Sequence, residues 1–279
     1  MILYIISIII IIIIIILFGL NQSENFDITK PILNKIPKTI YLCYKTKNIP
    51  KYIIPNWQKL NPDYTVKLYD NNDCIKFLQD EYGDELVDIF NYLKDGPIKA
   101  DLWRVCILYK YGGIYCDIDM EPLVPFIDYM KDDIDFLTCI SMTKNELNPH
   151  IIMSIPNNII LKLCIDKYIE KYRNKIPYEY WEYSIVYIMA DCINDNYNKN
   201  YNNNNNNNKN IIKYIYNFLF GKKKTHLNNE GIYTLYNMKC QFIKEIYAKN
   251  LFDIYCMYNN IRILNNRYKE YNPDDHKFI

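Results

Sequence analysis

The chain has 279 residues, a formal net charge of +1 and a hydrophobic content of 50%. Because this length and apolar content can bury the core of a domain, the composition excludes a disordered protein. With the charge near zero and no long basic stripe in the sequence, we expect no nucleic-acid partner.

Residues 2–20 form an apolar stretch in which Ser7 is the polar exception. Since a helix rises 1.5 Å per residue, about 19 residues nearly cross a hydrocarbon core of about 30 Å. We therefore expect an uncleaved membrane anchor over residues 2–20, followed by a stem over residues 21–36. This predicts a single-pass, signal-anchored protein of the secretory pathway or of a viral or host membrane. A cleaved signal peptide is the alternative, but a charged n-region and an A-x-A cleavage site are both missing.

Strand and helix patterns alternate at the start of the remaining chain, residues 37–279. Apolar residues predict a buried strand over residues 40–43, and alternation of residue types predicts a second strand over residues 64–70. A loop with a short helix is expected between them. Residues 71–83 and 84–93 carry two helical patterns, the first of which ends at a glycine. This order predicts an α/β layered domain.

A further helix is expected over residues 95–113. Asp101 and Arg104 are three residues apart and share one face of this helix. Trp103 and Tyr111 lie on another face, which we expect to pack in the core. A surface ion pair is the alternative to a functional role for Asp101 and Arg104.

The second half of the chain gives weaker signals. Residues 135–140 predict a strand, and residues 158–173 predict a helix. The asparagine run over residues 202–208 predicts a disordered surface insertion, because asparagine avoids helix and strand. The last sixty residues are rich in Tyr, Asn and Ile, and we expect them to be helical.

Nine cysteines and three histidines are spread along the chain. The cysteines have no C-x-x-C spacing and most lie in apolar runs. We therefore expect mainly free core thiols, with one or two disulfides left open. His150, His226 and His276 are far apart, and none has the close spacing of a metal-binding helix.

Two carboxylates, Asp117 and Asp119, follow the short apolar strand pattern of residues 113–116. In a continuing strand they would share one face, with Cβ atoms roughly 6–7 Å apart, while Ile118 would point into the core. Carboxylates this close repel each other unless a cation lies between them, and hard oxygen ligands select Mg²⁺ or Mn²⁺. Such an ion binds a diphosphate and stabilises it as a leaving group. Two exposed loop carboxylates are the alternative.

Three blocks of sequence, in order, resemble a known family. They are "IPKTIYLCYKT" (36–46), "NWQKLNPDYTVKLYD" (56–70) and "IKADLWRVCILYKYGGIYCDIDMEPL" (98–123). They are similar to blocks of glycosyltransferases that carry the DXD sugar-binding signature. That group includes initiating α-1,6-mannosyltransferases and, more distantly, the glucosylating domains of large bacterial toxins. The resemblance covers about a third of the chain.

The resemblance implies roles for five residues. Asp119 would ligate Mn²⁺ or Mg²⁺, and Asp117 would bind the donor ribose or sugar and help to place the metal. Asp101 and Arg104 would hold donor sugar hydroxyls or the phosphate. Tyr44 would stack on the nucleotide base. Asp117, Asp119 and Arg104 would carry the catalysis.

The resemblance also implies a fold and a reaction. The fold would be GT-A, an α/β, Rossmann-like nucleotide-sugar-binding domain over residues 37–279. The reaction would be metal-dependent transfer of a sugar from a nucleotide-sugar donor to a hydroxyl of a glycan, protein or lipid acceptor, with retention. Because later family motifs are not visible, a catalytically impaired sugar-nucleotide or glycan-binding protein is the alternative. A glycosidase would need two carboxylates on opposite sides of a sugar, about 5 to 10 Å apart, which one strand face does not offer.

Overall fold

The computed structural model describes residues 35–141, 146–204, 230–247, 254–272 and 277–278. The expected anchor over residues 2–20 and nearly all of the stem lie outside the described residues. Within the described ranges, no helix combines the length and apolar character needed to cross a membrane. Asn34–Ile279 form one compact unit.

Three parallel strands form the first half of the main sheet, in the order β2-β1-β3. They are β1 (Thr39–Cys43), β2 (Thr65–Tyr69) and β3 (Gly113–Cys116), and α2 (Ile53–Leu60) connects the first two. The strands and the short helix predicted from the sequence are confirmed. Because parallel strands end at the same edge of a sheet, the segments that follow β1 and β3 leave the sheet side by side.

Three helices, α3 (Asn71–Tyr82), α4 (Asp84–Tyr92) and α5 (Gly96–Tyr111), connect β2 to β3. The side chain of Asp70 caps α3 by accepting hydrogen bonds from two backbone N–H groups of its first turn. Helix α5 is buried along most of its length, and Trp103 is fully buried as predicted. Tyr111 was expected in the core, but it is 42% exposed because it lies at the last turn of α5.

The sheet continues beyond β3 with mixed strand directions. The order from β3 is β6-β5-β8-β9-β10-β4, with β7 on the side of β8. The strands are β4 (Glu121–Pro122), β5 (Phe136–Ile140), β6 (Leu147–Ser154), β7 (Gly231–Leu235), β8 (Met238–Tyr247), β9 (Ile254–Tyr258) and β10 (Ile261–Asn265). The β5–β8 pair is parallel, and the other pairs of this half are antiparallel.

The helical prediction for the last sixty residues is wrong in the part of it that the structure describes. That part forms β7 to β10 and a two-stranded sheet of β11 (Tyr271–Asn272) and β12 (Lys277–Phe278). Tyrosine and isoleucine favour strands, where the branched or aromatic side chain packs on a pleated surface. These strands form by pairing with distant strands, and the weak local periodicity of the sequence did not indicate them.

Helices α6 (Ile159–Arg173), α7 (Tyr180–Tyr183) and α8 (Ile185–Asn204) complete the helical layer. The predicted strand at residues 135–140 and helix at residues 158–173 are both confirmed. Helix α8 continues through Asn204. It therefore includes the first residues of the asparagine run that was expected to be disordered, and residues 205–208 lie outside the described residues.

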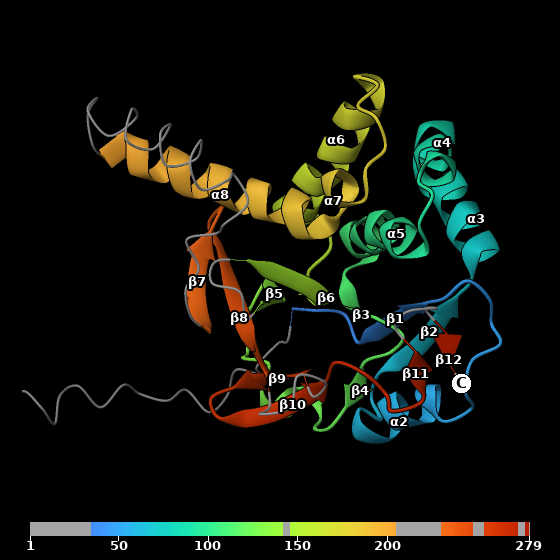
Figure 1. The fold of residues 1–279 in the computed structure, drawn as a ribbon. Helices are drawn as coiled ribbons and strands as arrows, with labels where there is room; N and C mark the ends of the chain where they lie inside the picture. The colour runs from blue at the N-terminus through green and yellow to red at the C-terminus, as the bar shows by residue number, and fades with distance from the viewer. Residues whose placement is uncertain (1–34, 142–145, 205–229, 248–253, 273–276, 279) are drawn as a thin grey trace, which may run out of the picture. The chain divides into compact units, whose positions relative to one another are not determined.

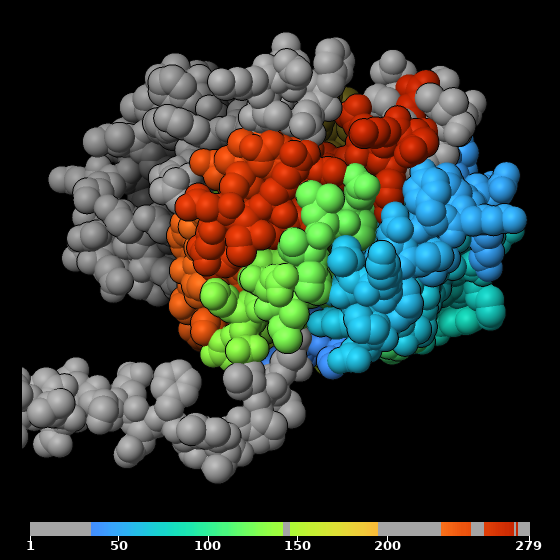
Figure 2. Space-filling view, turned by 90° about the horizontal axis from the view of Figure 1, so that it is seen from below, coloured from blue at the N-terminus to red at the C-terminus, as the bar shows by residue number. Residues whose placement is uncertain are grey.

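The core lies on both faces of the sheet, because neighbouring strand residues alternate between them. On β1, Tyr41 packs on the face covered by α3 to α6 and α8, while Ile40 and Leu42 pack on the opposite face. Figure 1 shows α3 to α8 on one side of the sheet and α2 beside β4 on the other. Figure 2 shows the second face, where the segment around β4 (green) lies between α2 (blue) and the C-terminal strands (red). The stretch between β3 and β4, which holds both aspartates, is thus surrounded by distant parts of the chain.

Candidate active site

The two aspartates of the D-x-D sequence lie on a turn at the end of β3. The strand ends at Cys116, and the backbone N–H of Met120 donates to the carbonyl of Asp117 at 3.1 Å. The prediction that Asp117 and Asp119 continue the strand is therefore wrong. Ile118 lies between them and is buried in the core, as predicted. A turn presents carboxylates at a sheet edge, where they can reach a ligand.

Backbone hydrogen bonds to two distant segments fix this turn. The N–H of Asp117 donates to the carbonyl of His150 on β6 at 2.8 Å. The N–H of Tyr268, which follows β10, donates to the carbonyl of Asp119 at 2.8 Å. The position of both carboxylates therefore depends on the second half of the sheet as well as on β3.

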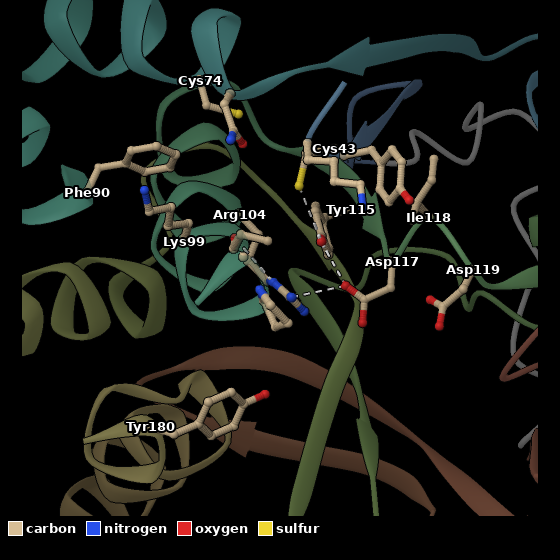
Figure 3. Close-up of a pocket in the computed structure, with 16 residues that line it drawn as sticks. Cys43, Cys74, Phe90, Lys99, Arg104, Tyr115, Asp117, Ile118, Asp119 and Tyr180 are labelled. Carbon is tan, nitrogen blue, oxygen red and sulfur yellow. Dashed lines mark hydrogen bonds and ion pairs between the residues drawn. The ribbon is translucent and has the colours of Figure 1, made fainter. Parts of the chain in front are cut away.

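The Arg104 side chain holds the carboxylate of Asp117 in place. Its Nη2 lies 2.8 Å from Oδ1 of Asp101 and 3.0 Å from Oδ1 of Asp117, and its Nη1 donates to the carbonyl of Pro149 at 2.7 Å. The guanidinium also lies over the ring of Tyr115, whose hydroxyl donates to Oδ1 of Asp117 at 2.7 Å. Figure 3 shows Asp117 turned toward Arg104 and Tyr115. Among the described residues these contacts use Oδ1, which leaves Oδ2 for a ligand.

Asp101 lies behind this arrangement and does not line the pocket. Its Oδ2 accepts a hydrogen bond from the N–H of Ile185, at the start of α8, at 3.0 Å. Asp101 and Arg104 are 6% and 4% exposed, so the alternative of a surface ion pair is wrong. Asp101 connects α5 to α8 and orients Arg104.

Burial and charge shift the pKa values of the acidic groups at the site. Burial and, to a smaller extent, the neighbouring Asp117 carboxylate raise the pKa of Asp119 to about 7. Burial likewise raises the pKa of Asp101 to about 6, although Arg104 opposes that shift. For Arg104, burial lowers the pKa, but Asp117, Tyr115 and Asp101 together raise it above its usual value. Arg104 therefore serves two carboxylates. His150 and Arg267 act to lower the pKa of Asp119, but burial and Asp117 outweigh them, so a cation bound at Asp119 would be favoured.

A pocket of about 400 Å³ lies in front of Asp117 and Asp119. This volume is in the range of small-molecule sites. In Figure 3, Phe90 and Cys74 lie on one side and Tyr180 on another, with Asp117 and Asp119 along a third. The lining residues are Cys43, Tyr44, Lys45, Asn71, Cys74, Phe90, Gly96, Pro97, Lys99, Ala100, Arg104, Tyr115, Asp117, Ile118, Asp119 and Tyr180.

Four of the five predicted site residues line this pocket, namely Tyr44, Arg104, Asp117 and Asp119. Tyr44 follows directly after β1, at the sheet edge where β3 also ends. These residues come from the first and third sequence blocks of the resemblance. The parallel pairing of β1 and β3 brings the two blocks together.

The sequence did not identify four other lining residues, Lys45, Lys99, Tyr115 and Tyr180. Tyr115 had a detectable signal, because it precedes Asp117 by two residues. Lys99 lies on the same helix as Arg104, about 1.4 turns before it. Tyr180 had none, since it is on α7, far from the D-x-D sequence along the chain.

Residues 49–143 match the family model described as "Glycosyltransferase sugar-binding region containing DXD motif". The resemblance predicted from the sequence is therefore confirmed. This third of the chain is therefore similar to the DXD class of glycosyltransferase sugar-binding regions.

Curated relatives align with between about a third and two thirds of the chain. The mannosyl phosphorylinositol ceramide synthase SUR1 of Saccharomyces cerevisiae is 34% identical over 34% of this chain and 27% of that enzyme. The initiation-specific alpha-1,6-mannosyltransferase of Candida albicans is 26% identical over 38% of this chain and 29% of that enzyme. Toxin A of Clostridium novyi is 31% identical over 63% of this chain and 7% of the toxin. In each case the chain spans less than a third of the relative's own length.

Proposed function

We propose that the protein is a metal-dependent glycosyltransferase that moves a sugar from a nucleotide-sugar donor to an acceptor hydroxyl. The observation that carries this proposal is the pair of carboxylates on one turn, beside a pocket of about 400 Å³. Arg104 and Tyr115 orient Asp117 there. In this proposal the domain has a GT-A fold.

The residues of the turn fit a hard divalent cation. Oδ2 of Asp117 and the carboxylate of Asp119 offer oxygen ligands, which Mn²⁺ and Mg²⁺ prefer. The raised pKa of Asp119, about 7, is expected of a buried carboxylate beside a second carboxylate, and a bound cation would lower it. When bound, such an ion neutralises the negative charge of the diphosphate leaving group.

Positive and aromatic side chains around the pocket suit the remainder of the donor. Lys45, Lys99 and Arg104 place positive charge on the pocket wall, where the diphosphate would bind. Tyr44 offers a ring on which the nucleotide base would stack. Arg104 contributes in a second way, because its hydrogen bonds hold Asp117 in position.

The acceptor and the stereochemistry belong to the same proposal. The names of two relatives include mannosyl phosphorylinositol ceramide synthase and alpha-1,6-mannosyltransferase. We propose a hydroxyl of a lipid or a glycan as the acceptor, and retention at the anomeric carbon. An apolar segment over residues 2–20, acting as a membrane anchor, would be consistent with a membrane-linked acceptor.

A panel of nucleotide sugars tests the proposal. The full chain, purified in detergent, is incubated with each donor and Mn²⁺, and released nucleoside diphosphate is measured with and without chelator. We expect release from one donor, loss of release with chelator, and loss in Asp119→Asn. Asp128→Asn is the matched control, because Asp128 is an exposed aspartate.

Two results would contradict this proposal. Metal-dependent donor binding with no release, even with lipid and glycan acceptors present, would favour the alternative of a sugar-nucleotide-binding protein. Release that persists with chelator and in Asp119→Asn would contradict the role of the turn.

A further inference from the structure

A second cluster of metal-ligand side chains lies in the sheet behind the turn. Cys139 on β5, His150 on β6 and Cys256 on β9 are all buried. Nε2 of His150 lies 3.1 Å from Sγ of Cys256, and the two sulfur atoms are 3.7 Å apart. One ligand atom from each residue lies within 4.8 Å of the others. Strands β6, β5, β8 and β9 are neighbours in this order (Figure 1), so three separate strands converge on one point.

These distances match the edges of a tetrahedral zinc site. Zinc binds thiolate sulfur at about 2.3 Å and imidazole nitrogen at about 2.0–2.1 Å. Tetrahedral angles then place two sulfur ligands about 3.8 Å apart, and a sulfur and a nitrogen ligand about 3.6 Å apart. The observed 3.7 Å between Cys139 and Cys256 needs almost no change, and the 3.1 Å contact of His150 needs a small one.

The other nitrogen of the histidine faces a fixed carboxylate. Nδ1 of His150 lies 3.6 Å from Oε1 of Glu245, a buried residue of β8. Asn148 and Asn266 donate to the same oxygen at 2.8 Å and 2.5 Å. Such a carboxylate orients a histidine so that Nε2 is available to a metal. Sγ of Cys256 lies 3.4 Å from the amide oxygen of Asn266.

The strand geometry is irregular where these residues meet. The register between β5 and β6 shifts between Thr138 and Ile140, which places Cys139 and His150 outside the regular ladder. On the other side, Glu245 of β8 is paired directly with Cys256 of β9. Irregular pairing of this kind redirects side chains and often accompanies functional sites.

We propose that Cys139, His150 and Cys256 bind one zinc ion, with Glu245 as the carboxylate that orients the histidine. This site is separate from the D-x-D turn and has a different ligand chemistry, namely sulfur and nitrogen in place of oxygen. Its function is structural, because His150 also accepts the backbone hydrogen bond of Asp117. A zinc ion would therefore fix β5, β6 and β9 at the point where β6 holds the turn.

Cobalt substitution tests this site without reference to the sugar reaction. The full chain is freed of metal, reduced and titrated with Co²⁺, and the absorption spectrum is recorded. We expect about one ion per chain with a thiolate-to-cobalt charge-transfer band and tetrahedral visible bands, all lost on addition of Zn²⁺. The bands should be retained in Asp119→Asn, so a failure of the donor site leaves this result unchanged.

Two cysteine pairs allow a matched control. Cys164 and Cys192 are also buried, with sulfur atoms 3.9 Å apart, on α6 and α8. Cys256→Ser and Cys139→Ser should lose the charge-transfer band, whereas Cys164→Ser should keep it. Absence of the band in the wild-type chain, or its persistence in Cys256→Ser, would overturn the proposal. A Cys139–Cys256 disulfide that reforms in place of metal binding would also overturn it.

A second measurement covers the case in which a variant does not fold, as judged by circular dichroism. The wild-type chain is alkylated briefly with and without Zn²⁺, and modified cysteines are located by mass spectrometry. Zinc should protect Cys139 and Cys256 and leave the modification of Cys164 and Cys192 unchanged. Equal modification of all four with and without zinc would contradict the site.

Discussion

Arg104 is the residue on which the site geometry depends most. Its guanidinium is buried between the carboxylates of Asp101 and Asp117 and lies over the ring of Tyr115. A buried charge of this kind is stable only while its partners are present. Because Arg104 is fixed on α5, its contact with Asp117 holds that carboxylate of the turn in one orientation.

Removal of the Tyr115 hydroxyl tests this orientation. Tyr115→Phe keeps the ring under Arg104 but removes the hydrogen bond to Asp117. Because one hydrogen bond to a charged group contributes about 1.5–3 kcal/mol, we expect the Kd for Mn²⁺ to rise by roughly ten- to a hundredfold. Titration calorimetry measures it. Tyr92→Phe is the control, since its hydroxyl donates to the carbonyl of Ile176, far from the turn, and an equal effect there would refute the account.

Asp119 predicts a pH dependence. Its folded-state pKa is about 7, above the ordinary 3.8, so the stability that it contributes is present below pH 4 and is lost as the pH rises through 7. A cation competes with the proton for the same carboxylate. We therefore expect the affinity for Mn²⁺ to fall about tenfold per pH unit below pH 7 and to level off above it.

The measurement is a series of Mn²⁺ titrations between pH 5.5 and 8. Asp119→Asn removes the titrating group and should show weak binding with a much flatter pH profile. A wild-type affinity that is constant from pH 5.5 to 8 would show that Asp119 does not take up a proton in this range.

At the scale of elements, the connection from α5 to β3 determines where the turn begins. Gly112 and Gly113 have φ angles of +63° and +103°, which residues with a Cβ rarely adopt. A Cβ at Gly113 would also lie 2.7 Å from the carbonyl oxygen of Thr39 on β1. The close approach of α5, β1 and β3 thus depends on glycine at this position.

Alanine substitution tests whether glycine is required at position 113. Gly113→Ala should lower the free energy of unfolding by about 1–3 kcal/mol from the backbone conformation, with a further loss from the contact with Thr39. Urea unfolding followed by circular dichroism measures the change. Gly96→Ala is the matched control, because a Cβ there meets nothing within 4 Å. The account is contradicted if both variants are equally stable.

Local patterns account for the elements that the sequence predicted correctly. The strands β1, β2 and β3 and the helices between them follow apolar residue patterns, and α3 and α5 end at glycines. The same patterns placed Tyr44, Arg104, Asp117 and Asp119 near one sheet edge, where they line one pocket. The turn at Asp117 was not predicted, because two of the hydrogen bonds that fix it are accepted by His150 on β6 and donated by Tyr268 after β10, both distant in the sequence.

At the scale of the whole unit, non-local pairing explains what the sequence did not indicate. The strands β8, β9 and β10 gain their order from β5 and β4, which lie more than a hundred residues earlier. His150 and Cys256 are 106 residues apart and meet only in the folded sheet. No spacing rule for short motifs detects such a pair. The first half of the chain supplies the residues of the pocket, and the second half fixes the turn from behind.

The most direct test of the central claim is a Mn²⁺ titration of the full chain followed by electron paramagnetic resonance. It is performed alone and with uridine or guanosine diphosphate, in the wild type, Asp117→Asn, Asp119→Asn and the control Asp128→Asn. The account predicts about one bound Mn²⁺ per chain, tighter binding with one of the diphosphates, and loss of both effects in the two turn variants only. Wild-type binding that is unchanged in Asp117→Asn and Asp119→Asn, or that no diphosphate strengthens, would contradict a metal-dependent donor site at this turn.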